Sequence, residues 1–251
     1  MEPALAPTRR DEDWRYSDVE ALVDLDQGTF ENWRDIDVAA GESFCECIVI
    51  EGESGTDLRR LRVKIAEGAR CELFVVNAGG RLGRVEVVVR LAQGAHFEFG
   101  GVTLGGGDTT REFVTRVTHD EPGATSNQTV RSVHWDSGTG NFLGRIDVVR
   151  DAQKTNAGQD FKALLLNKGA SANAVPQLEI FADDVKCNHG ATVGQLDEAA
   201  RFYMAARGIP PELSQRLLIR AFLADAFVTL ENEAERDRLL ETALAALGDR
   251  A

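Results

Sequence analysis

Two residues toward the C-terminal end of the chain, Cys187 and His189, have side chains that can bind a metal ion. They lie two positions apart in the segment DDVKCNHGATVG, residues 183–194. In an extended segment both would point to the same face, with Asn188 on the other. A thiolate and a neutral imidazole suit iron, copper or zinc, but two donors leave a metal open on its other sides. The pair is therefore either half of a site that a second chain completes, or a buried cysteine beside a capping histidine.

The other three cysteines, Cys45, Cys47 and Cys71, are spaced irregularly, and no C-x-x-C pair occurs in the chain. This spacing argues against a disulfide framework and against a zinc knuckle. If Cys45 and Cys47 belong to a strand, both point to one face. Their simplest interpretation is that of small buried apolar side chains.

Charge and composition narrow the classes of partner. The chain has 251 residues, of which 27% are charged and 43% hydrophobic, as in soluble globular proteins of one or two domains. Its formal net charge of −13 repels nucleic acid and anionic membranes, and no basic cluster exceeds the pair Arg59 and Arg60. No apolar run is long enough to cross a membrane, and the N-terminus lacks a signal-peptide core. We therefore expect a cytoplasmic protein that binds neither nucleic acid nor membrane.

Residues 36–194 are rich in short apolar runs, such as LRVKIAEG and RVEVVVRLAQG, that alternate apolar and polar side chains as half-buried strands do. A Gly-Ala pair follows such runs at positions 68–69, 94–95, 123–124, 169–170 and 190–191. Small residues at repeated corners fit a chain that coils turn upon turn. The sequence thus favours a β-helix or another β-solenoid for this region, and a two-sheet sandwich stays open because it gives the same alternation.

Helical segments flank this region. Residues 1–35 are predicted to form a short, partly helical lead-in with Ser17 as a helix N-cap. Residues 195–251 are predicted to form a small helical domain of three helices, the first ended by Gly208 and the second opened by prolines. The apolar residues of that second helix include Leu213, Leu217, Leu218 and Phe222.

Common catalytic motifs are absent from the sequence. It contains no P-loop, no G-x-G-x-x-G, no G-x-S-x-G and no H-E-x-x-H. The remaining histidines, His96, His119 and His134, are scattered among strand-like runs and are expected to be surface or core residues rather than ligands. A solenoid enzyme acting on carbohydrate would need a carboxylate pair on a shared face, and none is evident. We expect a protein that is not an enzyme and that binds no nucleotide.

Residues 176–209, PQLEIFADDVKCNHGATVGQLDEAARFYMAARGI, closely resemble the SufD branch of the SufB/SufD family of iron–sulfur cluster assembly proteins. Residues 157–180 extend the match, and the N-terminal DEDWRYSDVEAL is similar to the family's W-R/K-Y-S/T signature. Two departures stand out. Family members are commonly much longer, with a helical domain ahead of that signature, and they carry serine where this chain has Asn188.

The resemblance implies a right-handed parallel β-helix followed by the small helical domain. It also implies a complex with SufB and the ATPase SufC, in which the β-helix ends of the two family members pair and a transient iron–sulfur cluster forms at their interface. The C-terminal helices would dock the ATPase, and Leu213, Leu217, Leu218 and Phe222 are the contacts we expect there. In isolation, a homodimer is a further expectation.

Carried over position by position, Cys187 and His189 match the family's C-x-H pair. The resemblance makes His189 the better candidate for an interface iron or cluster ligand, with Cys187 as an auxiliary ligand or interface thiol. The function so implied is that of a scaffold subunit that supports iron entry and cluster formation beside SufB. The alternative is a purely structural adaptor that holds SufB and the ATPase without ligating iron or cluster.

Overall fold

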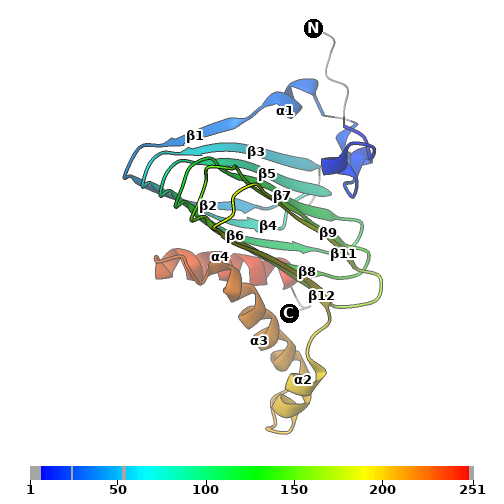
Figure 1. The fold of residues 1–251 in the computed structure, drawn as a ribbon. Coiled ribbons are helices and arrows are strands. Elements are labelled where there is room, and N and C mark those ends of the chain that lie inside the picture. The colour runs from blue at the N-terminus through cyan, green and yellow to red at the C-terminus, as the bar shows by residue number, and fades with distance from the viewer. Residues whose placement is uncertain (1–6, 24, 53–54, 249–251) are drawn as a thin grey trace.

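The computed structural model describes residues 7–23, 25–52 and 55–248. In this part of the chain, twelve strands coil into a parallel β-helix (Figure 1). Each coil gives one strand to each of two six-stranded sheets, and every strand pairs in parallel with the next coil's strand. The predicted β-helix is confirmed. A two-sheet sandwich is excluded, because its strands would pair in an antiparallel manner.

The odd-numbered strands form sheet A and the even-numbered strands form sheet B. Sheet A contains β1 (Arg34–Val38), β3 (Thr56–Ile65), β5 (Leu82–Leu91), β7 (Thr110–His119), β9 (Thr139–Val148) and β11 (Ser171–Ile180). Sheet B contains β2 (Ser43–Ile50), β4 (Arg70–Asn77), β6 (His96–Gly105), β8 (Thr125–His134), β10 (Asn156–Leu165) and β12 (Lys186–Gly194). Coil by coil, β1 and β2 open the solenoid, and β11 and β12 are its last strands in the described residues.

The corners from sheet A to sheet B explain part of the Gly-Ala repeat. Gly68, Gly94 and Gly123 have φ angles of 63°, 64° and 74°, a left-handed conformation that glycine adopts without strain. The alanine after each glycine is buried in the interior. At the matching corner before β10, Lys154 takes the same conformation with φ 65°, so this corner has no glycine signature in the sequence.

Two of the predicted corners differ. The pair at 169–170 lies at the opposite edge of the solenoid, between β10 and β11, where a Cβ on Gly169 would collide with the carbonyl of Asp136. The pair at 190–191 is not a corner at all, because Gly190 and Ala191 lie inside β12. Gly and Ala are common enough that this pair matched the repeat by composition alone.

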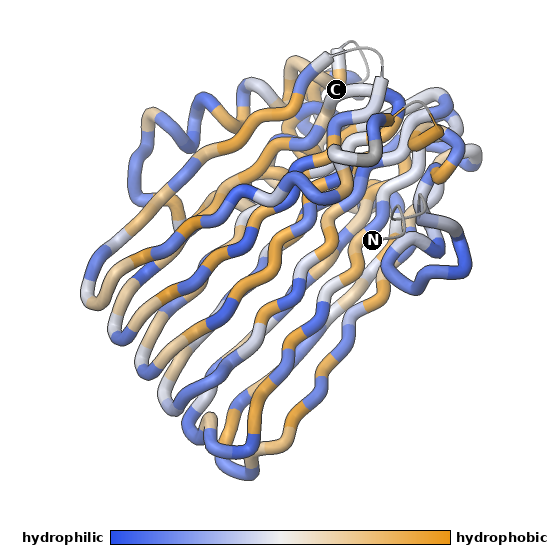
Figure 2. Tube along the Cα trace, turned by 90° about the horizontal axis from the view of Figure 1, so that it is seen from above, coloured by the Kyte–Doolittle hydropathy of each residue, from blue (hydrophilic) through white to orange (hydrophobic). Residues whose placement is uncertain are grey.

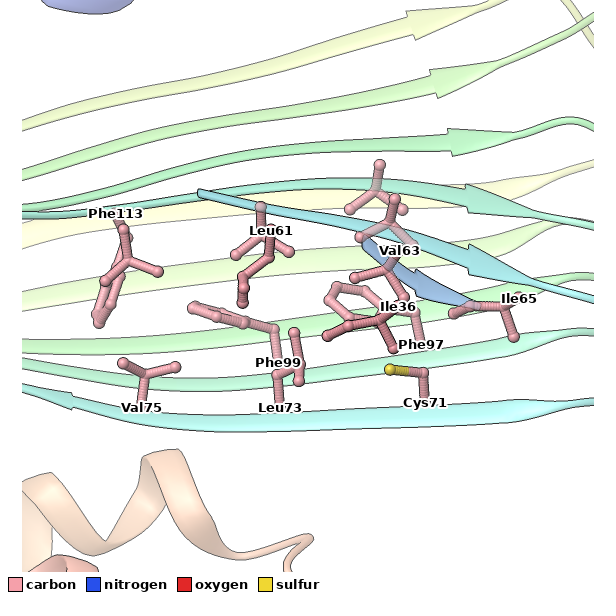
Figure 3. Close-up of a cluster of buried hydrophobic side chains, with 14 of the residues drawn as sticks. Ile36, Leu61, Val63, Ile65, Cys71, Leu73, Val75, Phe97, Phe99 and Phe113 are labelled. Atoms are coloured by element: carbon pink, nitrogen blue, oxygen red, sulfur yellow. The ribbon is translucent and has the colours of Figure 1, made fainter. Parts of the chain in front are cut away.

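Apolar side chains fill most of the interior between the sheets, and Figure 3 shows those of the first coils pointing toward one another. Their aromatic rings pack closely, with centroids 5.3 Å apart for Phe99 and Phe113 and 5.5 Å apart for Phe142 and Phe161. Along the strands, hydrophobic and hydrophilic residues alternate, as Figure 2 shows. Each such side chain stabilises the fold by about 1.5–3 kcal/mol when fully buried.

The N-terminal lead-in covers part of the outer face of sheet A. It contains η1 (Glu12–Trp14), η2 (Val19–Leu22) and α1 (Gln27–Glu31). The indole of Trp14 lies over the guanidinium of Arg84, 3.7 Å from ring centroid to Cζ. Ser17, predicted as an N-cap, instead donates a hydrogen bond of 3.0 Å to Glu112, and Asp18 is the N-cap of η2. A buried carboxylate on β7 therefore outcompeted the local cap for this hydroxyl.

The C-terminal helices are α2 (Glu198–Ala205), α3 (Pro211–Ala224), η3 (Asp225–Phe227) and α4 (Glu233–Leu247). The last three share a hydrophobic core with the outer face of sheet B, where Phe227 meets Phe74 with ring centroids 6.4 Å apart. Arg131, almost fully buried on β8, donates to Asp225 at 2.9 Å and to Asp160 at 2.5 Å. By contrast α2 projects away from the sheets (Figure 1), and none of its residues is buried. No helix of the described residues is both long and apolar enough to cross a membrane.

A candidate half-site at the open end of the β-helix

The strand that carries Cys187 and His189, β12, forms the edge of sheet B and pairs with β10. In the register, Cys187 lies beside Ala157 and His189 beside Gln159. Ala157 and Gln159 are buried in the interior of the solenoid, so the two residues of the pair belong to the inward-facing row. No coil follows β12 in the described residues, and this row therefore faces the open end of the solenoid.

Cys187 is half-buried at this end. Its side chain packs against an apolar cluster that includes Val148, Ala157 and Ala182. Burial raises the pKa of the thiol, and a hydrogen bond to the backbone of Ala157 lowers it in part. The sulfur is thus held as a thiol in the free chain, and a metal would have to displace its proton to bind it.

His189 is exposed on the same row. Its imidazole can offer a ring nitrogen to a metal that arrives from outside. Asn188 lies on the opposite face, where its side-chain oxygen is 3.2 Å from the position of a Cβ on Gly158. This is the arrangement that the two-residue period predicts, and it keeps the Asn188 amide away from the Cys187–His189 row.

The donors on this chain do not complete a metal site. Within the described ranges, no group of three or more His, Cys, Asp and Glu side chains is arranged to hold a metal ion. Cys187 and His189 are two donors of the kind that iron and iron–sulfur clusters accept. Their chemistry fits a metal or cluster whose remaining ligands come from another molecule.

The rest of the open end is almost free of charge. The inward-facing row of the last coil, which we call the end face, consists of Ala172, Ala174, Pro176, Leu178, Ile180, Cys187, His189, Ala191 and Val193. Val193 is 46% exposed, and Phe181 beside the end face is 60% exposed. Sequence reasoning missed these residues, because the alternation of a strand does not reveal that the strand is the last one. Once the register is known, one feature of the sequence distinguishes these two strands: none of their inward-facing positions holds a charged residue.

The predicted partner residues of α3 divide into two pairs. Leu213 and Leu217 are 46% and 42% exposed, as a contact surface requires. Leu218 and Phe222 are half-buried, and Phe222 packs against the core of sheet B below the guanidinium of Arg131. Only the first pair is therefore available to another molecule without rearrangement of α3.

Two aromatic side chains on α2 are also exposed, and the sequence did not predict either of them as a partner contact. Phe202 and Tyr203 are 78% and 57% exposed. Phe202 also lines a groove of about 220 Å³ between α2 and α3, together with Pro211 and Ser214. We call Phe202, Tyr203, Leu213 and Leu217 the helix surface. Exposed aromatic and leucine side chains are typical of protein-binding surfaces, so the helix surface is a candidate contact for another protein.

The other cysteines lie at the far end of the solenoid. Cys71 is fully buried in the interior of the first coils, which raises the pKa of its thiol to about 12. Cys45 and Cys47 both point to the outer face of β2, as a strand predicts. Cys45 is exposed there and Cys47 is half-buried, so the expectation of buried side chains is wrong for these two and right for Cys71. Partial desolvation first, and then Cys47 and Glu72, raise the pKa of Cys45 to about 11. None of the three belongs to the site at the last coil.

His119 and His134 are fully buried polar residues of the middle coils. A ring nitrogen of His119 lies 2.9 Å from the hydroxyl of Ser126, and one of His134 lies 3.1 Å from the carbonyl of Gly105. Burial lowers their pKa values to about 4 and about 3. They are neutral core histidines, in agreement with the sequence-based expectation.

Comparison with known proteins gives a consistent family. The model of the SufBD core domain, of the SUF system for FeS cluster assembly, matches residues 37–222. The chain is 38% identical over 182 residues to Protein ABCI7, chloroplastic, of Arabidopsis thaliana. The aligned segment covers 66% of this chain and 36% of the relative. It is 38% identical over 122 residues to the iron-sulfur cluster assembly protein SufD of Escherichia coli, covering 49% of this chain and 29% of the relative.

A further relative is the iron-sulfur cluster assembly protein SufD of Bacillus subtilis, at 34% identity over 139 residues, or 55% of this chain and 32% of the relative. The chain thus spans 29–36% of the length of these three relatives. The range matched by the family model includes the whole β-helix from β2 to β12, the Cys187–His189 pair, α2 and most of α3.

Proposed function

Because the chain belongs to the SufBD family of SUF iron–sulfur cluster assembly proteins, we propose that it is a non-catalytic scaffold subunit of that machinery. In this proposal the end face meets the β-helix of SufB, and iron or a nascent cluster is held between the two chains. The observation that carries the proposal is the half-site, two metal-binding side chains on an uncapped, uncharged end of a solenoid.

Pairing through the end face is supported by the chemistry of an edge strand. The outer edges of β11 and β12 present backbone N–H and C=O groups that another strand can bind. The apolar side chains of the end face would become interior residues of a continuous solenoid. SufB is the partner that we propose for this position, and in its absence a second copy of this chain could occupy it.

At such a junction, His189 would bind the cargo directly. It is exposed and lies on the row that faces the partner. Cys187 would act as an auxiliary thiol, which becomes a ligand when a metal displaces its proton. The remaining ligands to the iron or cluster would come from SufB. The described part of the chain brings two donors to this end, which is enough to share a cargo but not to retain it alone.

The helix surface would dock the ATPase SufC. Phe202 and Tyr203 are exposed on α2, which projects away from the sheets, and Leu213 and Leu217 are exposed on α3. The link from this surface to the β-helix runs through Arg131, which binds Asp225 directly after α3 and Asp160 on β10. ATP would be hydrolysed by that partner, and motion of α3 would reach the strand next to β12.

The test is anaerobic co-purification of the chain with SufB and SufC, followed by iron and sulfide analysis. His189→Ala should leave the three proteins together and lower the iron and sulfide bound per complex. His96→Ala, a histidine on a middle coil, is the matched control and should change neither. Unchanged iron and sulfide in the His189→Ala complex would contradict the ligand role.

One observation favours a second candidate, a structural adaptor that ligates nothing. Cys187 packs into an apolar cluster and is held as a thiol, as a purely structural cysteine would be. Under this alternative, the double variant Cys187→Ala/His189→Ala supports normal cluster assembly, whereas Leu213→Ser/Leu217→Ser loses the ATPase and the activity. The scaffold proposal requires both variants to fail, the first with its complex intact.

A further inference from the structure

One column of side chains inside the β-helix changes from apolar to polar as it approaches the end face. In the register of sheet B, Phe99 of β6 lies beside Gln128 of β8, which lies beside Gln159 of β10. His189 of β12 follows Gln159 at the open end. We call Gln128 and Gln159 the amide column. They continue a column that the first coils fill with Leu73 and Phe99.

The amide column is deeply buried and poorly satisfied. Gln128 is 0% exposed, and among the described residues neither its Nε2 nor its Oε1 has a hydrogen-bond partner. Gln159 is 1% exposed; its Nε2 donates to the carbonyls of Gly144 at 3.4 Å and Gln177 at 3.2 Å, whereas its Oε1 has no partner in the same residues.

A third buried residue with an unpartnered polar atom, Thr115, faces the amide column from sheet A. Thr115 of β7 lies beside Gly144 of β9 in the register. Since Gly144 meets Gln159 across the interior, one coil earlier Thr115 faces Gln128. The hydroxyl of Thr115 is buried and has no partner in the described part of the chain.

The residues around this cluster leave room for its polar side chains and separate it from the apolar coils. A Cβ on Gly144 would collide with Oε1 of Gln159, so the glycine makes room for the amide. Val87 and Phe99, both fully buried, close the cluster on the side of the first coils. The two hydrogen bonds from Nε2 of Gln159 close it toward the last coil.

Four orphan polar atoms in one closed interior region need hydrogen-bond partners, because buried polar groups in native proteins are almost always satisfied. One amide nitrogen and one hydroxyl can donate to a water molecule, and the two amide oxygens can accept from it, which matches the two hydrogen bonds that water accepts and the two that it donates. We propose that Gln128, Gln159 and Thr115 form an internal water site in the coils directly beneath His189. The end face then has a hydrated polar layer under its histidine and apolar packing elsewhere.

The direct test detects this water in the chain as it stands. In a ¹⁵N-labelled sample, NOEs between water and the side-chain amide protons of Gln128 report a water molecule that stays in the interior. We expect these cross-peaks in the wild type and also in Thr115→Val, in which the hydroxyl cannot relay exchange. Three of the four polar partners remain in that variant, so absence of the cross-peaks from either sample would overturn the proposal.

A second test uses stability. In a hydrated site, Gln128→Met removes satisfied hydrogen bonds and should lower the unfolding midpoint by about 2–4 °C. The matched control is Gln93→Met at an exposed corner, which should leave the midpoint in place. A raised midpoint in Gln128→Met would mean that the amide is dry and would overturn the water site. If this variant does not fold, the NOE measurement on the wild type decides alone.

Neither test measures iron or cluster. The outcome of both tests is therefore independent of the proposed function.

Discussion

The two ends of the β-helix are built differently. At the first coil, the inward-facing row carries an ion pair between Arg34 of β1 and Glu46 of β2 at 2.6 Å. The next strand, β3, adds a pair between Arg59 and Asp57 at 2.6 Å, beyond the end of the shorter β1. At the last coil, no inward-facing position of the end face carries Asp, Glu, Lys or Arg, and the candidate metal ligands Cys187 and His189 lie on it.

This difference indicates which end of the β-helix can stay exposed to solvent and which end is suited to contact another chain. A stack of repeats stays soluble and monomeric when its terminal repeats are polar, and an unprotected edge invites pairing with another chain. The charged first end meets the first requirement. The end face does not, and a partner that covers it would bury apolar side chains and bring its own ligands to the half-site. The comparison therefore supports a shared site at the last coil.

The largest expected effect comes from making the end face resemble the first end. Ala191→Glu places a carboxylate in the middle of the face. Burying it without a partner costs about 3–5 kcal/mol, so we expect SufB binding to weaken by at least about 100-fold, measured by surface plasmon resonance. Ser43→Glu, on the exposed edge of the first coil, is the control and should bind normally. Equal binding by both variants would show that the end face is not the contact.

The middle coils of the solenoid extend the comparison, because His119 and His134 are buried there whereas His189 is exposed at the end. Burial lowers the pKa of His119 to about 4, so as the pH falls below about 6.5 the unfolded chain binds a proton that the folded chain does not. Its contribution to the free energy of unfolding is complete above pH 6.5 and declines by about 1.4 kcal/mol per pH unit toward pH 4.

Urea unfolding at a series of pH values measures this dependence. His119→Gln should flatten it between pH 6.5 and 4 and leave the remaining slope to His134, whose pKa burial lowers to about 3. An undiminished slope in His119→Gln would show that acid sensitivity arises outside the middle coils.

A smaller effect is expected from the reverse exchange at the first end. Arg34→Leu/Glu46→Leu removes an ion pair and makes the inward-facing row of the first coil apolar. We expect self-association to strengthen by about tenfold, as seen by analytical ultracentrifugation, because both ends then lack a polar cap. Arg90→Leu/Asp120→Leu removes an ion pair of 2.7 Å from a middle coil and should leave association unchanged. If both double variants associate equally, the position of the charges has no special role.

The fold was predictable because its signals are local. Strand alternation and the left-handed corners at Gly68, Gly94 and Gly123 repeat along the chain, and so the β-helix could be inferred. Where the signal was not local, prediction failed. Lys154 adopts the same corner conformation without being glycine, and Gly190 lies within a strand. Ser17 binds Glu112, a residue 95 positions away that no capping pattern could indicate.

The candidate site was predictable in its residue types but not in its setting. The spacing of Cys187 and His189 placed them on one face, and the register agrees. Their position at an open end depends on which strand is last, and the buried amides of Gln128 and Gln159 depend on how coils stack. Similarly, the exposure of Phe202 depends on α2 projecting from the sheets, since its helical pattern alone suits a buried face as well.

The measurement that tests the account most directly is hydrogen exchange of the chain, free and in complex with SufB. The account predicts that edge amides of β11 and β12 become protected in the complex, while those of β1 and β2 exchange as in the free chain. Protection at β1 and β2 with none at β11 and β12 would contradict it, because the partner would then cover the charged end and leave Cys187 and His189 exposed.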